Sequence, residues 1–349
     1  MVGLALEGGG AKGAYQVGAY LALINNGIKF NFIAGTSIGA LNSALMVQGD
    51  TQKLMNIWLN TTTDIIGIKS DFITKLRTKK LKIDDLKEGF KSIKTIIHNK
   101  GIDTEPILHV INEYINEEKI RKQKTKMGLV TVKVKKMVPM ELTINDIPKG
   151  KLTEYILASC YLPVFASKKI IDDEYYLDGG FYNNLPTKLL ENQGCKTIYT
   201  VSLGSIGFKR NKLNKDTKII EIKPKKSLGS MFIFDKDSNL HNIQRGYYDT
   251  LKVLKKLDGE DYYFYFKKDK YYDRIIRKVD EELLAKMKKR FKANNNKEIL
   301  IRLTEHLLKK AKINELDVYD IKKQLKILNK NEKLKKEEKS FLTSCKYFW

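Results

Sequence analysis

The segment FNFIAGTSIGALNSALMVQGD, residues 30–50, decides the fold, because a strand-like pattern changes within it into a helical one. Residues 30–34 are an apolar run with the length of a buried strand. Gly35 and Thr36 lead from this run to Ser37, and a helix-length pattern continues to Gly49 and Asp50. The segment therefore predicts a strand, a tight turn at Ser37 and a helix.

The residues before this segment show the same alternation. Residues 2–6 form an apolar run, a glycine cluster follows, and residues 11–26 have the length of a helix. Within that helix Ala14, Gly18 and Ala22 recur every four residues, a stripe that lets a helix lie close on a sheet. Strands that alternate with helices favour an α/β fold of three layers with a mostly parallel central sheet.

The remainder of the chain predicts a larger first domain and a helical end. Residues 51–126 are helical in pattern and rich in lysine, so we expect an inserted helical region beside the site. A helix is expected near residues 152–160, and strands are expected at residues 128–134, 138–144, 196–203, 218–222 and 262–266, with two short ones around an acidic turn in 168–180. We therefore expect a domain over residues 1–266, with its motif-bearing core in 1–203, and a lysine-rich helical C-terminal region over 267–349.

The composition is typical of a globular protein of about two domains. Hydrophobic residues make up 42% of the 349 residues despite 30% charged ones. The sequence has no apolar run of about 20 residues and no secretory signal pattern at its start, so we expect an unprocessed cytoplasmic protein. Cys160, Cys195 and Cys345 are odd in number and widely spaced, which argues against disulfides and structural zinc.

The formal net charge of +24 indicates an anionic partner, such as a membrane surface or a nucleic acid, or else the lysine bias of an AT-rich genome. The excess lies after residue 66, since the chain up to there carries three lysines and three acids: Lys12, Lys29, Lys53, Glu7, Asp50 and Asp64.

A run near the end of the chain concentrates this charge. Its lysines alternate with apolar residues at helical spacing: Lys322, Lys323, Lys326, Lys330, Lys333, Lys335 and Lys336. The pattern permits a helix that binds an anionic membrane surface, and it equally permits the solvated face of a helix packed on the protein. The aromatic end, SFLTSCKYFW, is expected to dock on the body of the protein.

GTSIG, residues 35–39, matches GxSxG, the pattern of a nucleophile elbow. In such an elbow the serine sits on a sharp strand-to-helix turn with its hydroxyl exposed, and the two glycines keep side chains from crowding the neighbouring strand and helix. The N-terminus of the following helix favours the negative charge that develops in acyl transfer. The alternative is a purely structural turn between strand and helix.

EGGGAKG, residues 7–13, also lies between a strand and a helix. Its glycines match a dinucleotide-binding GxGxxG, but that site needs an acidic residue about 20 positions on, and none occurs between Glu7 and Asp50. A phosphate-binding P-loop fits less well, because Lys12 is followed by Gly13 and not by Ser or Thr. An oxyanion hole of backbone N–H groups remains.

A nucleophilic serine needs a base, and the chain offers four histidines, none within a recognisable motif: His98, His109, His241 and His306. Asp178 follows the apolar run EYYL and precedes Gly179 and Gly180, which allow another group to come close. An ordinary aspartate, with a pKa of about 3.9, is a weak base, but direct contact in a dry site would let it accept the serine proton. A structural β-turn is the alternative for this motif.

The three motifs in this order resemble those of the patatin-like phospholipases: GGGAKG, then GTSIG, then DGG more than a hundred residues later. ASCYLPVFA, residues 158–166, is similar to the segment that precedes the aspartate in bacterial members of this family. The resemblance covers residues 2–186, with weaker support through residue 203.

The resemblance implies a Ser–Asp dyad, with Ser37 as nucleophile and Asp178 as base, and an oxyanion hole formed by Gly8, Gly9 and Gly10. The supporting motif residues are Ala11, Lys12, Gly13, Gly35, Gly39, Gly179 and Gly180. Lys12 stands where many members carry Arg or Lys, either to bind a phosphate or to support the loop. The resemblance implies no cofactor and no metal.

The resemblance also implies a substrate class, because it indicates a lipid acyl hydrolase that cleaves glycerophospholipids through an acyl-enzyme intermediate. A related carboxylesterase, thioesterase or transacylase would share every one of these residues. A non-catalytic lipid- or nucleic-acid-binding protein on a hydrolase scaffold is the alternative from another class.

Overall fold

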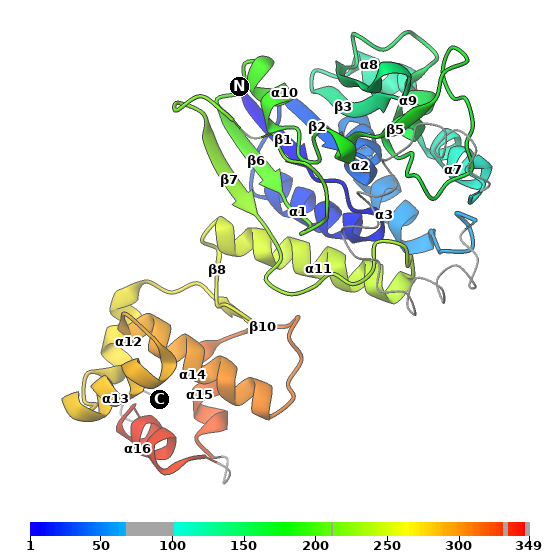
Figure 1. The fold of residues 1–349 in the computed structure, drawn as a ribbon. Coiled ribbons are helices and arrows are strands. Elements are labelled where there is room, and N and C mark those ends of the chain that lie inside the picture. The colour runs from blue at the N-terminus through cyan, green and yellow to red at the C-terminus, as the bar shows by residue number, and fades with distance from the viewer. Residues whose placement is uncertain (68–100, 211, 331–333, 346–349) are drawn as a thin grey trace. The chain divides into compact units, whose positions relative to one another are not determined.

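The computed structural model describes residues 1–67, 101–210, 212–330 and 334–345, which Figure 1 draws as a coloured ribbon. The chain forms two compact units, Met1–Thr250 and Leu251–Trp349. The first unit therefore ends before residue 266, where the sequence pattern placed a domain boundary. Part of the expected helical insertion, residues 68–100, lies outside the described residues, as does His98.

In the described residues of the first unit, seven strands form one sheet in the order β4-β3-β2-β1-β6-β7, with β5 paired to β3. The strands are β1 Val2–Leu6, β2 Phe32–Thr36, β3 Lys126–Lys133, β4 Val138–Thr143, β5 Tyr176–Asp178, β6 Thr197–Val201 and β7 Lys218–Ile222. The pairs among β3, β2, β1, β6 and β7 are parallel, and only β4 and β5 run antiparallel to β3. The prediction of a mostly parallel sheet is confirmed.

Helices of the first unit cover both faces of this sheet. They are α1 Ala14–Asn25, α2 Ile38–Gln48, α3 Thr51–Asn60, α7 Glu105–Tyr114, α8 Glu117–Lys122, α9 Leu152–Ser159, α10 Thr187–Asn192 and α11 Lys236–Val253, with short 3-10 turns η1 Gly10–Gly13, η2 Lys135–Met137 and η3 Gly179–Phe181. Ala5 and Ala34 pack with α10, whereas the alternate residues Leu4 and Ile33 point to the opposite face and are equally buried. The sheet is therefore the middle of three layers.

The small-residue stripe of α1 has a different partner from the one expected. A Cβ on Gly18 would overlap the backbone of Ile243 in α11, and a Cβ on Gly246 would overlap the backbone of Tyr15. Helices α1 and α11 thus lie side by side at a separation that only glycine allows at these positions (Figure 1). The prediction that this stripe serves contact with the sheet was wrong at Gly18, because the close approach there is to another helix.

The second unit combines helices with a small sheet. Its helices are α12 Asp269–Ile276, α13 Glu281–Phe291, α14 Asn296–Lys310, α15 Ile321–Leu328 and α16 Lys336–Ser344, and its strands are β8 Leu257–Asp258, β9 Tyr263–Tyr265 and β10 Val318–Tyr319. The strands pair in the order β10-β9-β8. The prediction of a helical C-terminal region is confirmed, and this small sheet was not expected within it.

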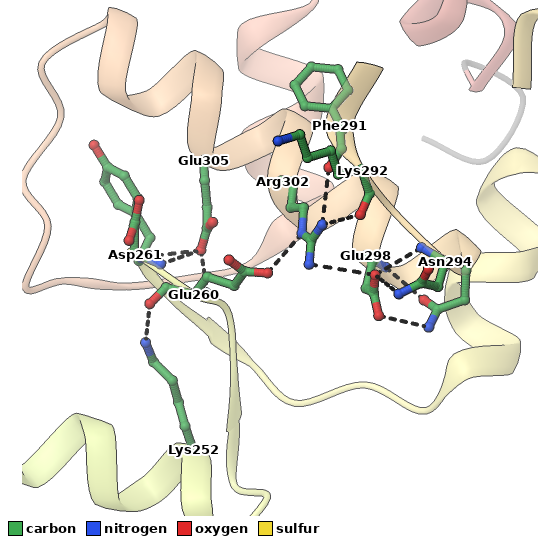
Figure 2. A network of polar contacts seen from close by, with 11 residues as sticks. Lys252, Glu260, Asp261, Phe291, Lys292, Asn294, Glu298, Arg302 and Glu305 are labelled. Carbon is green, nitrogen blue, oxygen red and sulfur yellow. Dashed lines mark hydrogen bonds and ion pairs between the residues drawn. The ribbon is translucent and has the colours of Figure 1, made fainter. Parts of the chain in front are cut away.

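A polar network around α14 holds the loop between β8 and β9 (Figure 2). The buried carboxylate of Glu305 accepts the backbone N–H groups of Glu260, Asp261 and Tyr262 at 2.6, 2.9 and 3.1 Å. One turn earlier, Arg302 pairs with Glu260 at 2.8 Å. Because burial raises the pKa of Glu305, these N–H donors are what offset the cost of placing its charge inside the unit.

The lysine-rich run near the end of the chain does not form one continuous helix, since α15 ends at Leu328 and α16 begins at Lys336. The apolar side chains Ile321, Leu325 and Leu328 of α15 are buried in the core of the second unit. Phe341 and Leu342 of α16 lie in the same core, which confirms that this part of the aromatic end docks on the protein. Residues 331–333 and 346–349 lie outside the described residues.

Across the part of the chain that the structure describes, no helix combines the length and the apolar character needed to cross a membrane.

Candidate active site

Ser37 occupies the turn between β2 and α2 with φ of 56° and ψ of −129°. This left-handed backbone conformation is uncommon for a residue with a side chain, and it costs about 1–3 kcal/mol. Ser37 is also the residue that precedes the first turn of α2, yet its hydroxyl makes no capping hydrogen bond. The strained turn therefore presents a hydroxyl that the helix does not use.

The two glycines of GTSIG are required by the packing of this turn. A Cβ on Gly35 would overlap the backbone of Gly39, and a Cβ on Gly39 would stand 2.5 Å from the carbonyl oxygen of Leu6 in β1. Helix α2 therefore starts directly against two neighbouring strands. Any larger residue at either glycine would push the start of the helix, and Ser37 with it, away from the sheet.

Ser159, which the sequence patterns did not single out, holds the elbow from the other side. Its hydroxyl accepts the backbone N–H of Ser37 at 2.9 Å and donates to the carbonyl oxygen of Val130 at 2.7 Å. Ser159 is fully buried at the end of α9. The N–H of Ser37 is therefore satisfied within the protein and is not available as an oxyanion donor.

Asp178 reaches the neighbourhood of Ser37 through the register of the sheet. Thr36 pairs with Val130 in β3, and Thr131 of the same strand pairs with Asp178 at the end of β5. The side chain is 3% exposed, and its Oδ1 accepts the N–H of Gly180 at 2.7 Å. Burial raises the pKa of Asp178 to about 6, while hydrogen bonding from the Ser37 hydroxyl and from Gly180 acts in the opposite direction.

The second carboxylate oxygen of Asp178, Oδ2, has no partner with good hydrogen-bond geometry among the described residues. The Ser37 hydroxyl is nevertheless near enough to lower the pKa of this carboxyl, and hydrogen bonds between catalytic groups are often long or poorly aligned before substrate binds. Cys160 lies beside both groups: burial raises the pKa of its thiol, the Asp178 charge raises it further, and Ser37 lowers it.

The glycine loop after β1 lies directly beside Ser37. A Cβ on Gly8 would stand 3.0 Å from the Cβ of Ser37. The N–H of Gly8 donates to the carbonyl of Asn184 at 3.1 Å, whereas the N–H groups of Gly9 and Gly10 have no acceptor among the described residues. Ala11, Lys12 and Gly13 complete the short turn η1.

Glu7 anchors the start of this loop. Its carboxylate is completely buried, accepts the backbone N–H of Leu203, and pairs with the ammonium of Lys209 at 2.8 Å. Burial lowers the pKa of Lys12, and the charge of Glu7 partly opposes that shift. The loop thus carries a paired buried acid on one side and a half-buried lysine on the other.

An apolar pocket of about 110 Å³ opens onto Ser37. Its polar lining is limited, among the described residues, to Ser37, Thr61, Cys160 and the backbone of Gly10. Aliphatic and aromatic side chains form the rest: Ile38, Leu41, Ile57, Trp58, Ile66, Ile107, Val110, Ile111, Leu162, Phe165, Met231, Phe232 and Phe234. Such a lining suits a hydrocarbon chain and offers nothing to a charged group.

No histidine lines this pocket in the described part of the chain. His109 on α7 and His241 on α11 are exposed, and His306 lies in the second unit, 3.4 Å from Glu338. The titratable groups that the structure brings to Ser37 are therefore the Asp178 carboxyl and the Cys160 thiol. Because burial raises the pKa of the thiol, the carboxylate of Asp178 is the candidate base.

The region that holds the candidate site matches a known protein family. The family model for patatin-like phospholipases matches residues 4–190, which include the glycine loop, Ser37 and Asp178. The chain is 26% identical over 218 residues to mouse patatin-like phospholipase domain-containing protein 6, covering 58% of this chain and 14% of that protein. It is also 26% identical over 218 residues to the Drosophila melanogaster neuropathy target esterase sws, covering 58% of this chain and 13% of that protein.

Solved structures that match the chain include VipD from Legionella pneumophila, at 16% identity, a TM-score of 0.39, and coverage of 98% of this chain and 83% of that one. The type III effector ExoU matches at 15% identity and a TM-score of 0.34 over 96% of this chain and 70% of that one. The family model, by contrast, spans more than half of the sequence, from β1 into α10. The chain belongs to the patatin-like phospholipase family.

Proposed function

We propose that this protein is a serine acyl hydrolase that cleaves fatty acyl esters of glycerophospholipids, with Ser37 as nucleophile and Asp178 as base. The observation that carries the proposal is the strained Ser37 turn beside a buried carboxylate, with an apolar pocket opening onto the hydroxyl. Membership of the family supports the same reaction class.

In the first half of the reaction, the Ser37 oxygen attacks the ester carbonyl carbon while Asp178 accepts the hydroxyl proton. The N–H groups of Gly9 and Gly10 hold the oxyanion of the tetrahedral intermediate, because Gly8 has already donated its N–H to Asn184. When the intermediate collapses, the carbon–oxygen bond to the alcohol breaks. The departing lysophospholipid oxygen takes the proton from Asp178, which leaves the acyl group on Ser37.

In the second half, a water molecule attacks the acyl-enzyme with Asp178 again as base, and the fatty acid leaves as Ser37 recovers its proton. The raised pKa of Asp178 favours this role, since a carboxyl with a pKa of about 6 holds a proton more readily than an ordinary aspartate and is still ionised at neutral pH. The apolar pocket takes the acyl chain. No cofactor or metal enters either step.

We also propose which parts of the chain carry out catalysis and which contact a membrane. The catalytic groups all come from residues 1–250. The basic residues 267–349 belong to the second unit, which begins at Leu251, and peripheral contact with anionic membranes is proposed for the protein as a whole. The burial of the apolar face of α15 in its own unit favours the packed alternative for that helix over insertion into a bilayer.

Lipid product analysis tests the reaction. Full-length protein is incubated with mixed phospholipid vesicles, and the products are identified by mass spectrometry beside those of Ser37→Ala. Lysophospholipid and fatty acid in equal amounts, absent with Ser37→Ala, are expected. Fatty acid released only from soluble esters or acyl-thioesters would favour a carboxylesterase or thioesterase, acyl transfer to another lipid would favour a transacylase, and vesicle binding without products would favour a binding protein.

A further inference from the structure

The loop after β6 carries two large apolar side chains that the fold leaves in solvent. Ile206 and Phe208 are each 55% exposed. Single exposed apolar residues are common on protein surfaces, so exposure alone decides little. These two residues differ because they lie two positions apart and because exposed cations follow them at once, namely Lys209, Arg210 and Lys212.

The backbone under these side chains is held in place. Phe208 donates its N–H to the carbonyl of Gly180 at 3.0 Å, and its own carbonyl accepts the N–H of Asn184 at 2.5 Å. Both polar groups of this residue are therefore bonded to the segment that follows Asp178. The phenyl ring consequently projects from an anchored main chain, and burying it in a partner would require little further ordering of that residue.

The loop also stands at the same edge of the sheet as the candidate active site. Strands β1, β2 and β6 are parallel, with Leu6 paired to Gly35 and to Val201, so the segments after these three residues leave the sheet together. Ser205 lies in direct contact with Gly9 of the glycine loop. Lys209 forms the ion pair with Glu7 at the start of that loop.

The basic residues that follow the apolar pair in the sequence line a groove. An open groove of about 700 Å³ is lined, in the described residues, by Lys188, Lys209, Arg210, Lys212, Leu213 and Asn214, and no carboxylate is among them. Lys188 and Lys209 are paired with Glu191 and Glu7. The guanidinium of Arg210 stacks over the ring of Tyr182 at 4.5 Å and remains exposed, as does the ammonium of Lys212.

We infer that this surface, made of Ile206, Phe208, Arg210 and Lys212 and here called the β6 loop surface, docks the protein on the headgroup region of an anionic phospholipid bilayer. Apolar side chains that enter the interface, flanked by cations that meet anionic headgroups, are the combination by which peripheral proteins bind membranes. The inference rests on the proposed function, because docking at this edge brings a bilayer-borne acyl ester to Ser37. A second copy of this chain would match the apolar pair but not the surrounding positive charge, since like charges would meet.

The first test measures binding, not catalysis, so that it stands apart from the proposed reaction. Full-length Ser37→Ala protein is sedimented with vesicles of equal parts phosphatidylglycerol and phosphatidylcholine at about 0.1 M and about 1 M salt, where the Debye length falls from about 10 Å to about 3 Å. At high salt the apolar contribution dominates. Adding Ile206→Ser with Phe208→Ser is expected to weaken this binding at least tenfold, which corresponds to about 1.4 kcal/mol.

Matched controls come from exposed residues elsewhere. Ile219 in β7 and Ile327 in α15 are 41% and 54% exposed, so Ile219→Ser with Ile327→Ser removes similar apolar area and is expected to change binding by less than about twofold. Lys212→Glu should weaken binding severalfold at low salt only. Lys29→Glu should have little effect, because Lys29 precedes β2 and lies at the opposite edge of the sheet.

A gain of signal guards against a variant that merely misfolds. Brominated phosphatidylglycerol in the vesicles is expected to quench the fluorescence of the tryptophan introduced by Phe208→Trp, but not that of the tryptophan introduced by Ile327→Trp. Equal vesicle binding by the loop variant and its parent at high salt, or quenching only at position 327, would overturn the inference. So would self-association without vesicles that Ile206→Ser with Phe208→Ser abolishes, because it would assign the surface to a second copy. Hydrolysis of vesicle lipid by the wild type is measured separately. The binding experiments therefore test the membrane surface, and the hydrolysis experiment tests the proposed reaction.

Discussion

The backbone N–H of Ser37 donates a hydrogen bond to the hydroxyl of Ser159 across 2.9 Å. This bond joins the strained elbow to the end of α9, and the same hydroxyl continues to Val130 in β3. Because Ser37 holds an unfavourable left-handed conformation, a buried bond to its N–H offsets part of that cost. Ser159 therefore acts as a positioning residue for the proposed nucleophile.

Ser159→Ala should lower both stability and turnover. The change leaves the N–H of Ser37 buried without an acceptor, which costs about 1–3 kcal/mol in the free energy of unfolding. We expect kcat to fall about tenfold as the elbow loosens, with a smaller change in KM. Urea unfolding and steady-state kinetics measure the two effects.

Ser43→Ala is the matched control for this change. Ser43 is equally buried, but its hydroxyl donates only to Ala40 within α2. Its loss should leave kcat unchanged and cost less stability. Equal kinetic damage from the two variants would show that Ser159 has no particular role at the elbow.

The rate should depend on the ionisation of Asp178. The proposed base must be ionised to accept the Ser37 proton, and its pKa is raised to about 6 by burial. We therefore expect kcat/KM to fall tenfold for each pH unit below about 6, well above the range in which an ordinary aspartate would limit the rate. A rate that stays constant down to pH 4.5 would remove Asp178 from this role.

The free energy of unfolding should also depend on the ionisation of Asp178, but in the opposite direction from the rate. The folded pKa of about 6 lies above the ordinary value of 3.8, so the folded state favours protonated Asp178. The contribution of Asp178 to the free energy of unfolding is fully present below about pH 3.8 and is lost as the pH rises through about 6. The loss amounts to at most roughly 3 kcal/mol. Asp178→Asn should therefore gain thermal stability relative to the wild type between pH 4 and pH 7.5. A difference in Tm that does not vary with pH would contradict the raised pKa.

The apolar pocket should set the acyl-chain preference. Leu41 lines it one helical turn after Ser37, and Leu41→Phe would fill space that the substrate chain is proposed to use. If a long acyl chain buries about two fewer of its methylenes in the variant, transition-state stabilisation falls by roughly 1.6 kcal/mol, or about fifteenfold in kcat/KM. The kcat/KM for a butyryl ester should change little. Leu240→Phe, at an exposed position of α11, is the control. An equal loss for both chain lengths would place the acyl chain elsewhere.

The sequence predicted those strands and turns that depend only on residues close together in the chain. The strand at residues 2–6, the strand at 218–222 and the serine turn all follow from short apolar runs and glycines, and β1, β7 and Ser37 lie there. The stripe on α1 indicated that something packs closely at Gly18 but could not identify α11 as the partner. Likewise the amphipathic pattern of α15 is the same for a helix on a bilayer and for one buried against its own unit.

The groups around the candidate site depend on distant parts of the chain. Asp178 approaches Ser37 only because β5 pairs antiparallel to β3, and no local pattern carries that pairing. Ser159 bonds a backbone N–H, a role that any small hydroxyl residue could fill, so its sequence context holds no signal beyond the family-like segment. Lys209 forms its ion pair with Glu7 from the loop between β6 and β7. The path of that loop is set by the pairing of the two strands, so no pattern near Glu7 or Lys209 predicts the contact.

Labelling with a fluorophosphonate probe tests the central claim most directly, because the oxygen of an activated serine attacks the phosphorus of the probe and displaces fluoride, which leaves a phosphonate ester on that serine. Wild-type protein is incubated with the probe, digested, and mapped by tandem mass spectrometry beside Ser37→Ala and Asp178→Asn. The proposed dyad predicts stoichiometric modification of Ser37, none in Ser37→Ala, and labelling slowed at least a hundredfold in Asp178→Asn, as expected when a general base is lost. Modification of a different serine, or undiminished labelling of Ser37→Ala, would contradict it.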